Sequence, residues 1–339
     1  MIPVYLFSFI LSFALTCYLT PRIANAAVKI GIVDKPDGKL KTHEKITPYL
    51  GGLAIYIPFI LTLGMTIRFD LHVFALLLSS TIILVLGLID DFGAISPSVK
   101  LLGQAIAVFV LIKGGIYIQL IFLPQWIGIG LTFLWLIGIT NAVNIIDIKD
   151  GLATGVIFTA SVFLFIVAVI DGDLMIAIFT ITFTGSLLGF LRFNWQPAMI
   201  YLGDTGSMFL GFIIGALAMS GSYTQNNNIA ALSPIILLGV PIFDTVLVSI
   251  CRLRQGKSPL LGSPDHFAHR LLKLGWPLTG IVLTAYAITA LFGLLMLFLM
   301  GLENVWAATI IVGGVCIAGI IMIFLLANVQ MSKGKKQAR

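Results

Sequence analysis

Apolar stretches of about 20 residues alternate with short polar segments along the whole chain. A helix rises 1.5 Å per residue, so a stretch of this length crosses the ~30 Å hydrocarbon core of a bilayer. The pattern predicts an all-α integral membrane protein, a polytopic bundle of about eleven transmembrane helices. The predicted spans are residues 4–24, 49–67, 72–89, 98–117, 124–143, 152–170, 174–191, 205–221, 229–250, 278–299 and 305–327.

The composition agrees with a chain that is solvated mainly by lipid. Hydrophobic residues make up 59% of the 339 residues and charged residues 10%, whereas soluble domains are about half apolar and a quarter charged. The spans leave no stretch long enough for a soluble domain. We therefore treat residues 1–339 as a single transmembrane domain.

The charged residues gather on one side of the predicted spans. All but Arg68 and Lys113 of the 20 Lys and Arg lie on that side, as do all but four of the 14 acidic residues. The positive-inside rule makes this side cytoplasmic, so an odd number of spans places the N-terminus outside and the C-terminus in the cytoplasm. The topology thus explains the net charge of +6, and we expect lipid headgroups and phosphorylated substrates as partners rather than nucleic acid.

Several carboxylates stand at the ends of spans rather than in the middle of loops. An ionised side chain in hydrocarbon costs about 3 kcal/mol, so such groups must face water, a cation or one another. Asp90 and Asp91 directly follow the apolar run 81–89. Neighbouring helical residues point about 100° apart, which indicates different roles for the two carboxylates. The alternative is a simple hydrated helix end.

Two further polar motifs stand at span ends. In the first, polar residues at every third position form a stripe on one helix face that ends at Gly151; its members are Asn141, Asn144, Asp147 and Asp150. A polar seam between helices is the alternative reading. In the second, Asp204 is flanked by Gly203 and Gly206 at a predicted helix start. This setting suits a hard cation that bridges to phosphates, and simple N-capping is the rival.

The segment 252–276 is rich in basic residues, which suits a polyanionic ligand but also follows from the positive-inside rule. His266 and His269 face the same side if this segment is helical. Asp244 lies inside its span and either supports the site or is bonded structurally. The chain has no His-Glu-x-x-His motif and no Cys ligand set, so the oxygen ligands favour Mg²⁺, with Mn²⁺ as the alternative, and phosphoryl chemistry.

Five motifs in order resemble the polyprenyl-phosphate N-acetylhexosamine-1-phosphate transferase family. They are Lys41-Thr-His43 with Pro48 and Gly51-Gly52, Gly87-Leu-Ile-Asp90-Asp91, Asn141-x-x-Asn144-x-x-Asp147-x-x-Asp150-Gly151, Tyr201-Leu-Gly203-Asp204-Thr-Gly-Ser207 and Pro241-x-x-Asp244-Thr. The chain is more similar to the undecaprenyl-phosphate N-acetylglucosamine-1-phosphate transferases than to the phospho-N-acetylmuramoyl-pentapeptide transferases, because residues 47–52 lack Pro-Thr-Met-Gly-Gly.

The resemblance implies transfer of N-acetylhexosamine-1-phosphate, most simply GlcNAc-1-phosphate, from a UDP-sugar to undecaprenyl phosphate, with release of UMP. This reaction is the first membrane step of surface-polysaccharide or teichoic-acid synthesis. The resemblance makes Asp204 the Mg²⁺ ligand, assigns Asp90 and Asp91 to the attacking lipid phosphate, and places Asn194 and Tyr201 at the uracil. The substrate-binding residues it implies are Lys41, His43, Asn144, Asp147, Asp150, Asn194, Tyr201, His266, His269 and Arg270.

The same resemblance places the enzyme in the cell membrane, with the site on the cytoplasmic face. The loops near 25–48, 90–97, 144–151, 192–204 and 251–277 form that site, and a homodimer is left open. The alternatives are a phospho-N-acetylmuramoyl-pentapeptide transferase and, from another class, an ion-coupled transporter. A transporter would hold its acids near the midplane in discontinuous helices and show repeat symmetry.

Overall fold

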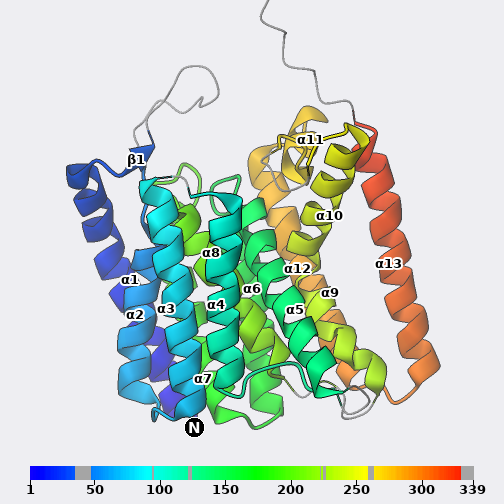
Figure 1. Ribbon diagram of the computed structural model, residues 1–339, viewed down its shortest axis with the longest axis horizontal. Helices are drawn as coiled ribbons and strands as arrows, with labels where there is room; N and C mark the ends of the chain where they lie inside the picture. Colours follow the sequence, from blue (N-terminus) through cyan, green and yellow to red (C-terminus); the bar gives the residue numbers. More distant parts are fainter. Residues whose placement is uncertain are drawn as a thin grey trace, which may run out of the picture.

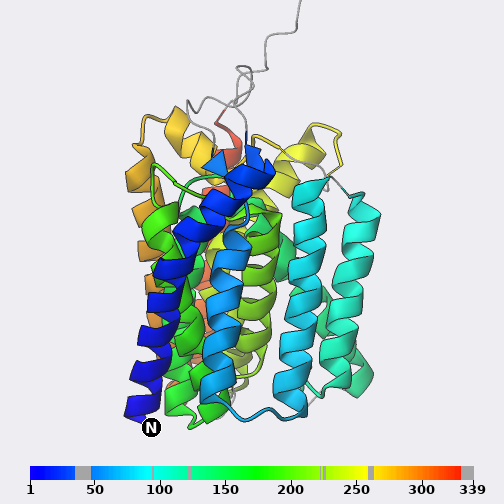
Figure 2. The ribbon, with the colours of Figure 1, turned by 90° about the vertical axis from the view of Figure 1, so that its left-hand side faces the viewer.

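The computed structural model describes residues 1–34, 47–93, 95–120, 124–221, 223, 227–258 and 263–329. Helices of the described part form a bundle (Figures 1 and 2), and only the short strands β1 (Val33–Asp34) and β2 (Thr47–Pro48) pair, antiparallel, at one end of it. The helices are α1 (Ile2–Ile30), α2 (Gly51–Thr66), α3 (Leu71–Phe92), α4 (Pro97–Lys113), α5 (Gln125–Ile146), α6 (Leu152–Ile170), α7 (Leu174–Asn194), α8 (Gly203–Met219), η1 (Asn228–Leu232), α9 (Ser233–Leu237), α10 (Gly239–Arg254), α11 (Phe267–Lys273), α12 (Leu278–Met300) and α13 (Val305–Ala327).

The helices confirm the prediction of an all-α polytopic membrane protein. In the described residues, seven helices are long and apolar enough to cross a membrane, or eight if one bent pair counts as a span. The helices α2 and α8 are also apolar but shorter, and α4 has 17 residues. Each of the eleven predicted stretches contains a helix, while the number eleven and the direction of the chain across the bilayer stay predictions.

One predicted span is not a single straight helix. We expected one helix over residues 229–250, but the structure bends by 72° between Asn228–Leu237 and Gly239–Arg254. Pro241 explains why the second part starts afresh, because proline has no N–H to donate and is tolerated in the first turn of a helix. The bend swings α10 toward the end of the bundle at which α11 lies (Figure 1).

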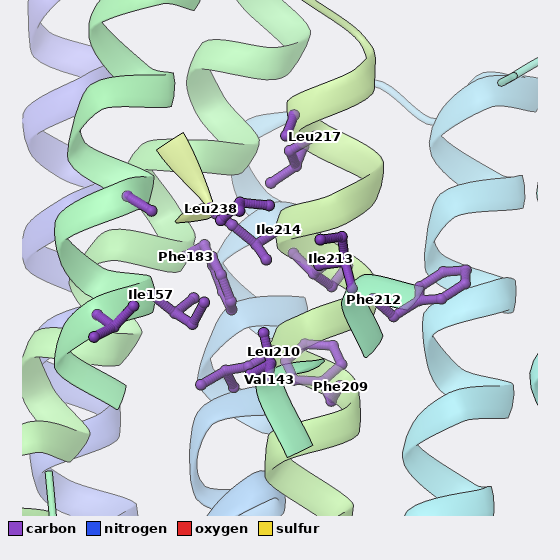
Figure 3. Close-up of a cluster of buried hydrophobic side chains, with 14 of the residues drawn as sticks. Val143, Ile157, Phe183, Phe209, Leu210, Phe212, Ile213, Ile214, Leu217 and Leu238 are labelled. Atoms are coloured by element: carbon purple, nitrogen blue, oxygen red, sulfur yellow. The ribbon is translucent and has the colours of Figure 1, made fainter. Parts of the chain in front are cut away.

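The helix α8 forms the centre of the bundle. Its residues 205–218 are all buried, and it packs on α3, α5, α2 and α6. Figure 3 shows the apolar cluster around it, in which the ring of Phe209 lies 6.1 Å from that of Phe183 of α7. Phe212 of α8 and Leu238 at the bend belong to the same cluster. In contrast, α13 buries only Ala308 and Leu326, so nearly all of its surface is left for lipid.

Glycines allow two helices to approach the start of α8 closely. A Cβ atom on Gly87 of α3 would lie 2.5 Å from the carbonyl oxygen of Asp204 and 2.6 Å from the Cα of Thr205. A Cβ on Gly52 of α2 would collide with the backbone of Gly206. Small residues of this kind are common where membrane helices pack backbone to backbone. They bring the polar ends of α3 and α8 within bonding distance.

Candidate active site

Three charged side chains meet where α3 ends and where α4 and α8 begin. The ammonium of Lys100 lies 2.7 Å from Asp90 Oδ2 and 3.3 Å from Asp204 Oδ2, so it bridges the two carboxylates. Asp90 Oδ1 accepts a hydrogen bond from the Ile95 N–H at 3.0 Å. The Asp90 side chain is 9% exposed and that of Asp204 is 34% exposed. Asp204 is therefore the carboxylate with more room for an additional ligand.

Asp91 has a different role from its neighbour. Its Oδ1 accepts from the Asp204 N–H at 2.8 Å, and its Oδ2 accepts from the Thr205 N–H at 3.0 Å and the Thr205 hydroxyl at 2.5 Å. These bonds satisfy donors of the first turn of α8, as a capping residue does, although Asp91 is far away in sequence. Asp91 thus holds the backbone that carries Asp204.

The end of α5 supplies amide and carboxylate groups on another side of Asp204. The Nδ2 of Asn144 donates to Asp204 Oδ1, and to Ser207 Oγ at 2.8 Å. Asp147 follows directly after the last residue of α5. Burial, together with the carboxylates of Asp204 and Asp91, raises the pKa of Asp147 to about 8. Asp147 is therefore mostly protonated at neutral pH, while the three carboxylates of Asp90, Asp91 and Asp204 still outnumber the one ammonium of Lys100, which favours binding of a cation.

A pair of amides fixes α4 against α5 one turn below this cluster. Gln104 Nε2 donates to Asn141 Oδ1 at 3.3 Å, and Asn141 Nδ2 donates to Gln104 Oε1 at 2.7 Å. Gln104 is one turn from Lys100, and Asn141 is one turn from Asn144. In the polar stripe from Asn141 to Asp150, Asn141 thus contributes to helix packing, and Asn144 belongs to the carboxylate cluster.

The turn between α5 and α6 is tied to the end of α7. Asp150 Oδ2 accepts from the Ala198 N–H at 2.9 Å. The side chain of Asn194 is buried, and its Oδ1 accepts from the Gly151 N–H at 3.2 Å and the Thr154 hydroxyl at 2.8 Å. Its Nδ2 donates to the Ile200 carbonyl at 3.0 Å. Asn194 thus shapes the turn with both ends of its amide.

Tyr201 lies at the same end of the bundle, before α8. Its ring centroid is 5.9 Å from that of Tyr49, at an angle of 51°, and its N–H donates to the Pro48 carbonyl at 2.9 Å. Gly51 and Gly52 donate back to the carbonyls of Tyr201 and Leu202 at 3.0 and 3.1 Å. The two tyrosines therefore form an aromatic pair beside the start of α8, the helix that carries Asp204.

The histidines of the segment 263–270 are held from behind by α10. The carboxylate of Asp244, which is fully buried, lies 2.8 Å from His266 Nδ1 and accepts from the Phe267 N–H at 2.8 Å. The ring of His269 packs edge-on against that of His266 at 5.7 Å. Burial, and next the charge of Lys149, lowers the pKa of His269. The histidine pair therefore lies near the turn between α5 and α6.

Arg270 is buried and bonded on all sides. Its guanidinium donates to Asp265 Oδ1 at 2.6 Å and to the carbonyls of Leu326 and Val329 at 2.7 and 2.8 Å. These bonds cap the end of α13 and pair the charge. Arg270 therefore has a structural role. The sequence did not reveal this role, because the positive-inside rule predicts a basic residue here whether it binds a ligand or stabilises the fold.

The structure brings together many of the residues that the sequence singled out, and it adds others. Lys41 and His43 lie outside the described residues. Lys100 and Tyr286 were not predicted: Lys100 reads as one more basic residue at a span end, and Tyr286 stands inside an apolar span. The Tyr286 hydroxyl donates to the Gly151 carbonyl at 2.5 Å. A lysine that starts an apolar stretch is a sequence signal for such a role, because lipid would otherwise exclude it.

The residues fit a magnesium ion held mainly by one carboxylate. Among the residues that the structure describes, no group of three His, Cys, Asp or Glu side chains could enclose a metal. Magnesium does not need such a cage, since it usually binds one or two carboxylates, several waters and substrate phosphates. The partly exposed carboxylate of Asp204, within a cluster that has surplus negative charge, meets this requirement.

Comparison with known proteins places these residues in a wider context. Residues 73–222 match glycosyl transferase family 4. A Bacillus subtilis protein described as a probable undecaprenyl-phosphate N-acetylglucosaminyl 1-phosphate transferase is 35% identical over 316 residues, 90% of this chain and 87% of that protein. A decaprenyl-phosphate N-acetylglucosaminephosphotransferase of Mycolicibacterium smegmatis is 31% identical over 80% of this chain and 76% of its own. A phospho-N-acetylmuramoyl-pentapeptide-transferase of Halalkalibacterium halodurans is 31% identical, over 87% and 97%.

Proposed function

This chain belongs to glycosyl transferase family 4, and we propose that it transfers N-acetylglucosamine-1-phosphate from the UDP-sugar to undecaprenyl phosphate, with release of UMP. The protein is a multi-pass membrane enzyme. The proposal places its site at the cytoplasmic face of the cell membrane, the N-terminus outside, and the reaction at the start of surface-polysaccharide or teichoic-acid synthesis. The relatives named for polyprenyl-phosphate N-acetylglucosamine transfer support the donor and the acceptor.

The observation that carries the proposal is the charge arrangement at one end of the bundle. Lys100 bridges the carboxylates of Asp90 and Asp204. A second group of basic side chains consists of Lys149 and the two histidines His266 and His269. A reaction between two phosphorylated substrates needs a cation between them and positive groups around them. Both kinds of group occur here at one end of the bundle of membrane helices.

The chemistry asks the protein mainly to position the reactants. An oxygen of the lipid phosphate attacks the β-phosphorus of the UDP-sugar, and the bond from that phosphorus to the bridging oxygen of UMP breaks. A phosphate monoester is largely dianionic at neutral pH, because its second pKa is about 6, so a strong base is not required. Magnesium on Asp204 would screen the repulsion between the two anions.

In this proposal the side chains of the protein have separate tasks. Asp90 and Lys100 orient the lipid phosphate, and Lys100 also offsets charge on the phosphate as it attacks. Asn144 holds Asp204 from behind. Asp91 fixes the start of α8. Tyr201, with Tyr49 behind it, offers an aromatic face to the uracil.

The decisive experiment is a transfer assay with purified protein. The protein is incubated with Mg²⁺, undecaprenyl phosphate and a panel of UDP-sugars, and the lipid product is identified by mass. We expect a GlcNAc-1-phosphate adduct and an equal amount of UMP. Binding of UDP-GlcNAc with neither lipid product nor UMP would refute the enzyme and favour a carrier.

Asp204→Asn tests the metal role within the same assay. We expect it to abolish Mg²⁺-dependent transfer while the protein stays in the membrane, because an amide binds Mg²⁺ far more weakly than a carboxylate does. Asp173→Asn is the matched control, since Asp173 caps α7 through the Ile176 N–H at 2.9 Å and Asn caps equally well. Retained turnover in Asp204→Asn would remove the metal role from this residue.

A phospho-N-acetylmuramoyl-pentapeptide transferase is the alternative within the family, and the relative at 31% identity keeps it in view. The segment 47–52, which lacks Pro-Thr-Met-Gly-Gly, favours the smaller sugar donor. Including UDP-N-acetylmuramoyl-pentapeptide in the panel decides between the two, since a lipid adduct of that mass would replace our assignment.

A further inference from the structure

A buried acid and a histidine form a pair that the reaction scheme above does not use. Asp244 is fully buried in α10, and both of its oxygens are engaged by the segment that carries the histidines. One oxygen lies 2.8 Å from His266 Nδ1, and the other accepts from the Phe267 N–H at 2.8 Å. An isolated buried carboxylate is costly, so these contacts are needed to keep the acid inside the protein.

The contacts define which nitrogen of His266 is left for a ligand. A carboxylate only accepts hydrogen bonds, so Nδ1 carries a proton and donates it to Asp244. Among the described residues, no group is bonded to Nε2, and Nε2 is not one of the enclosed polar atoms that lack a partner. The free nitrogen is thus the one on the ring edge away from Asp244.

The surroundings of His266 point to an anionic ligand. His269 stacks edge-on against it at 5.7 Å, and the charge of Lys149 acts on His269. Lys149 itself is half-buried and has no hydrogen-bond or ion-pair partner among the described residues. Two imidazoles in ring contact and a nearby lysine that has no bonded partner among the described residues match the phosphates of a nucleotide.

We propose that Asp244 is a positioning residue that orients His266 so that Nε2 contacts the diphosphate of the sugar nucleotide. The inference rests on the proposed function and deepens it. In the complex, Nδ1–H donates to Asp244 and Nε2–H donates to a phosphate oxygen of the diphosphate. The carboxylate of Asp244 stabilises the imidazolium, as the buried acid of a catalytic triad does for its histidine. His266 then offsets charge that develops on UMP as it leaves.

The rival explanation is that Asp244 only anchors the segment 263–270. Asp265 provides the comparison, because it lies in that segment, is buried, and pairs with Arg270 at 2.6 Å, while its carboxylate has no hydrogen bond to the His266 ring. If anchoring is all that matters, Asp244→Asn and Asp265→Asn should have similar consequences. If orientation of the ring matters, only Asp244→Asn should change the state of His266.

A spectroscopic experiment tests the pair without any turnover. The chain has four histidines, so ¹⁵N-histidine labelling in nanodiscs gives few signals, which His→Gln variants assign. We expect His266 Nδ1 to be protonated in the free protein and Nε2 to shift when UDP is added without metal. Asp244→Asn should remove the Nδ1 signature, and Asp265→Asn should keep it. An unchanged His266 spectrum in Asp244→Asn, or no response to UDP, would overturn the inference.

A kinetic cycle tests the contribution to transfer. We expect Asp244→Asn to lower kcat by about 10–100-fold, as loss of a supporting partner does elsewhere, with KM for undecaprenyl phosphate unchanged. In a His266→Ala background, Asp244→Asn should cost less than about twofold more, since residues that act as a unit are not additive. Losses that multiply would show that Asp244 acts independently and would refute the pairing. If the wild-type protein releases no UMP, the proposed function fails, while the spectra still decide on the Asp244–His266 pair.

Discussion

Replacing Gly87 with alanine should disable the site without touching a charged residue. The added Cβ would lie 2.5 Å from the Asp204 carbonyl oxygen and 2.6 Å from the Thr205 Cα, whereas ordinary contacts begin at 3.4 Å. Both neighbours are backbone atoms, which cannot rotate away. The helices α3 and α8 must therefore separate by roughly 1 Å, an overpacking that costs about 1–3 kcal/mol.

The separation acts directly on the bonds that join the two helices. Asp91 on α3 accepts from the Asp204 and Thr205 N–H groups at 2.8 and 3.0 Å, and a shift of this size takes both beyond normal hydrogen-bond distance. Asp204 then moves away from Asp90 and Lys100. A misplacement of about 1 Å can lower an enzymatic rate by about 10²-fold.

The assay measures UMP release and thermal stability of purified Gly87→Ala beside a matched control. Gly138→Ala in α5 is suitable, because nothing lies within 4 Å of a Cβ at that position. Both variants gain the same helix propensity, about 1 kcal/mol, so their difference isolates the contact. We expect normal behaviour from Gly138→Ala and both lower stability and at least tenfold slower release from Gly87→Ala. Wild-type turnover in Gly87→Ala would refute the view that this contact sets the site.

Two further predictions concern the carboxylates. Asp91→Asn keeps one acceptor oxygen for three donors, so we expect a lower melting temperature as well as loss of most transfer activity. Asp90→Asn should lose transfer activity with little change in melting temperature. If both variants lowered the melting temperature equally, the capping role of Asp91 would be contradicted. The pKa of Asp147 is about 8 in the native state rather than 3.8, so between these pH values the native state holds a proton that the unfolded chain lacks. In EDTA, the free energy of unfolding should therefore fall as the pH rises toward about 8. Asp147→Asn or added Mg²⁺ should flatten that fall, and a slope that persists in Asp147→Asn would exclude this carboxylate as its source.

The helices were predictable because the signal for each one is local. A run of apolar residues long enough for the bilayer reads as a helix whatever lies beside it, and each predicted stretch contains one. The bend at Leu238 was missed because apolar residues continue on both sides of it, and Gly239 and Pro241 give only a weak break signal. The apolar composition of a segment predicts that it lies in the membrane, whereas the direction of a helix depends on the helices that it packs against.

The site was predictable in outline and not in detail. Acids at span ends marked the end of the bundle at which Asp90 and Asp204 meet, since charge placement in lipid is costly. The cap that Asp91 forms on α8 was not predictable, because its donors lie 113 and 114 residues away. Arg270 and Lys149 look alike in sequence, yet the first is fully bonded inside the protein, and the second has no hydrogen-bond or ion-pair partner among the described residues. Only the fold distinguishes a paired cation from one left for a ligand.

The burial of α8 has a consequence for how the protein is made. The four helices that pack most extensively on it, α2, α3, α5 and α6, all precede it in the chain, so the ribosome has delivered them before α8 emerges. With only 17 residues, α8 is short for an independent stay in a bilayer. Its arrival carries Asp204 into place, so the proposed magnesium site forms only when α8 has been inserted.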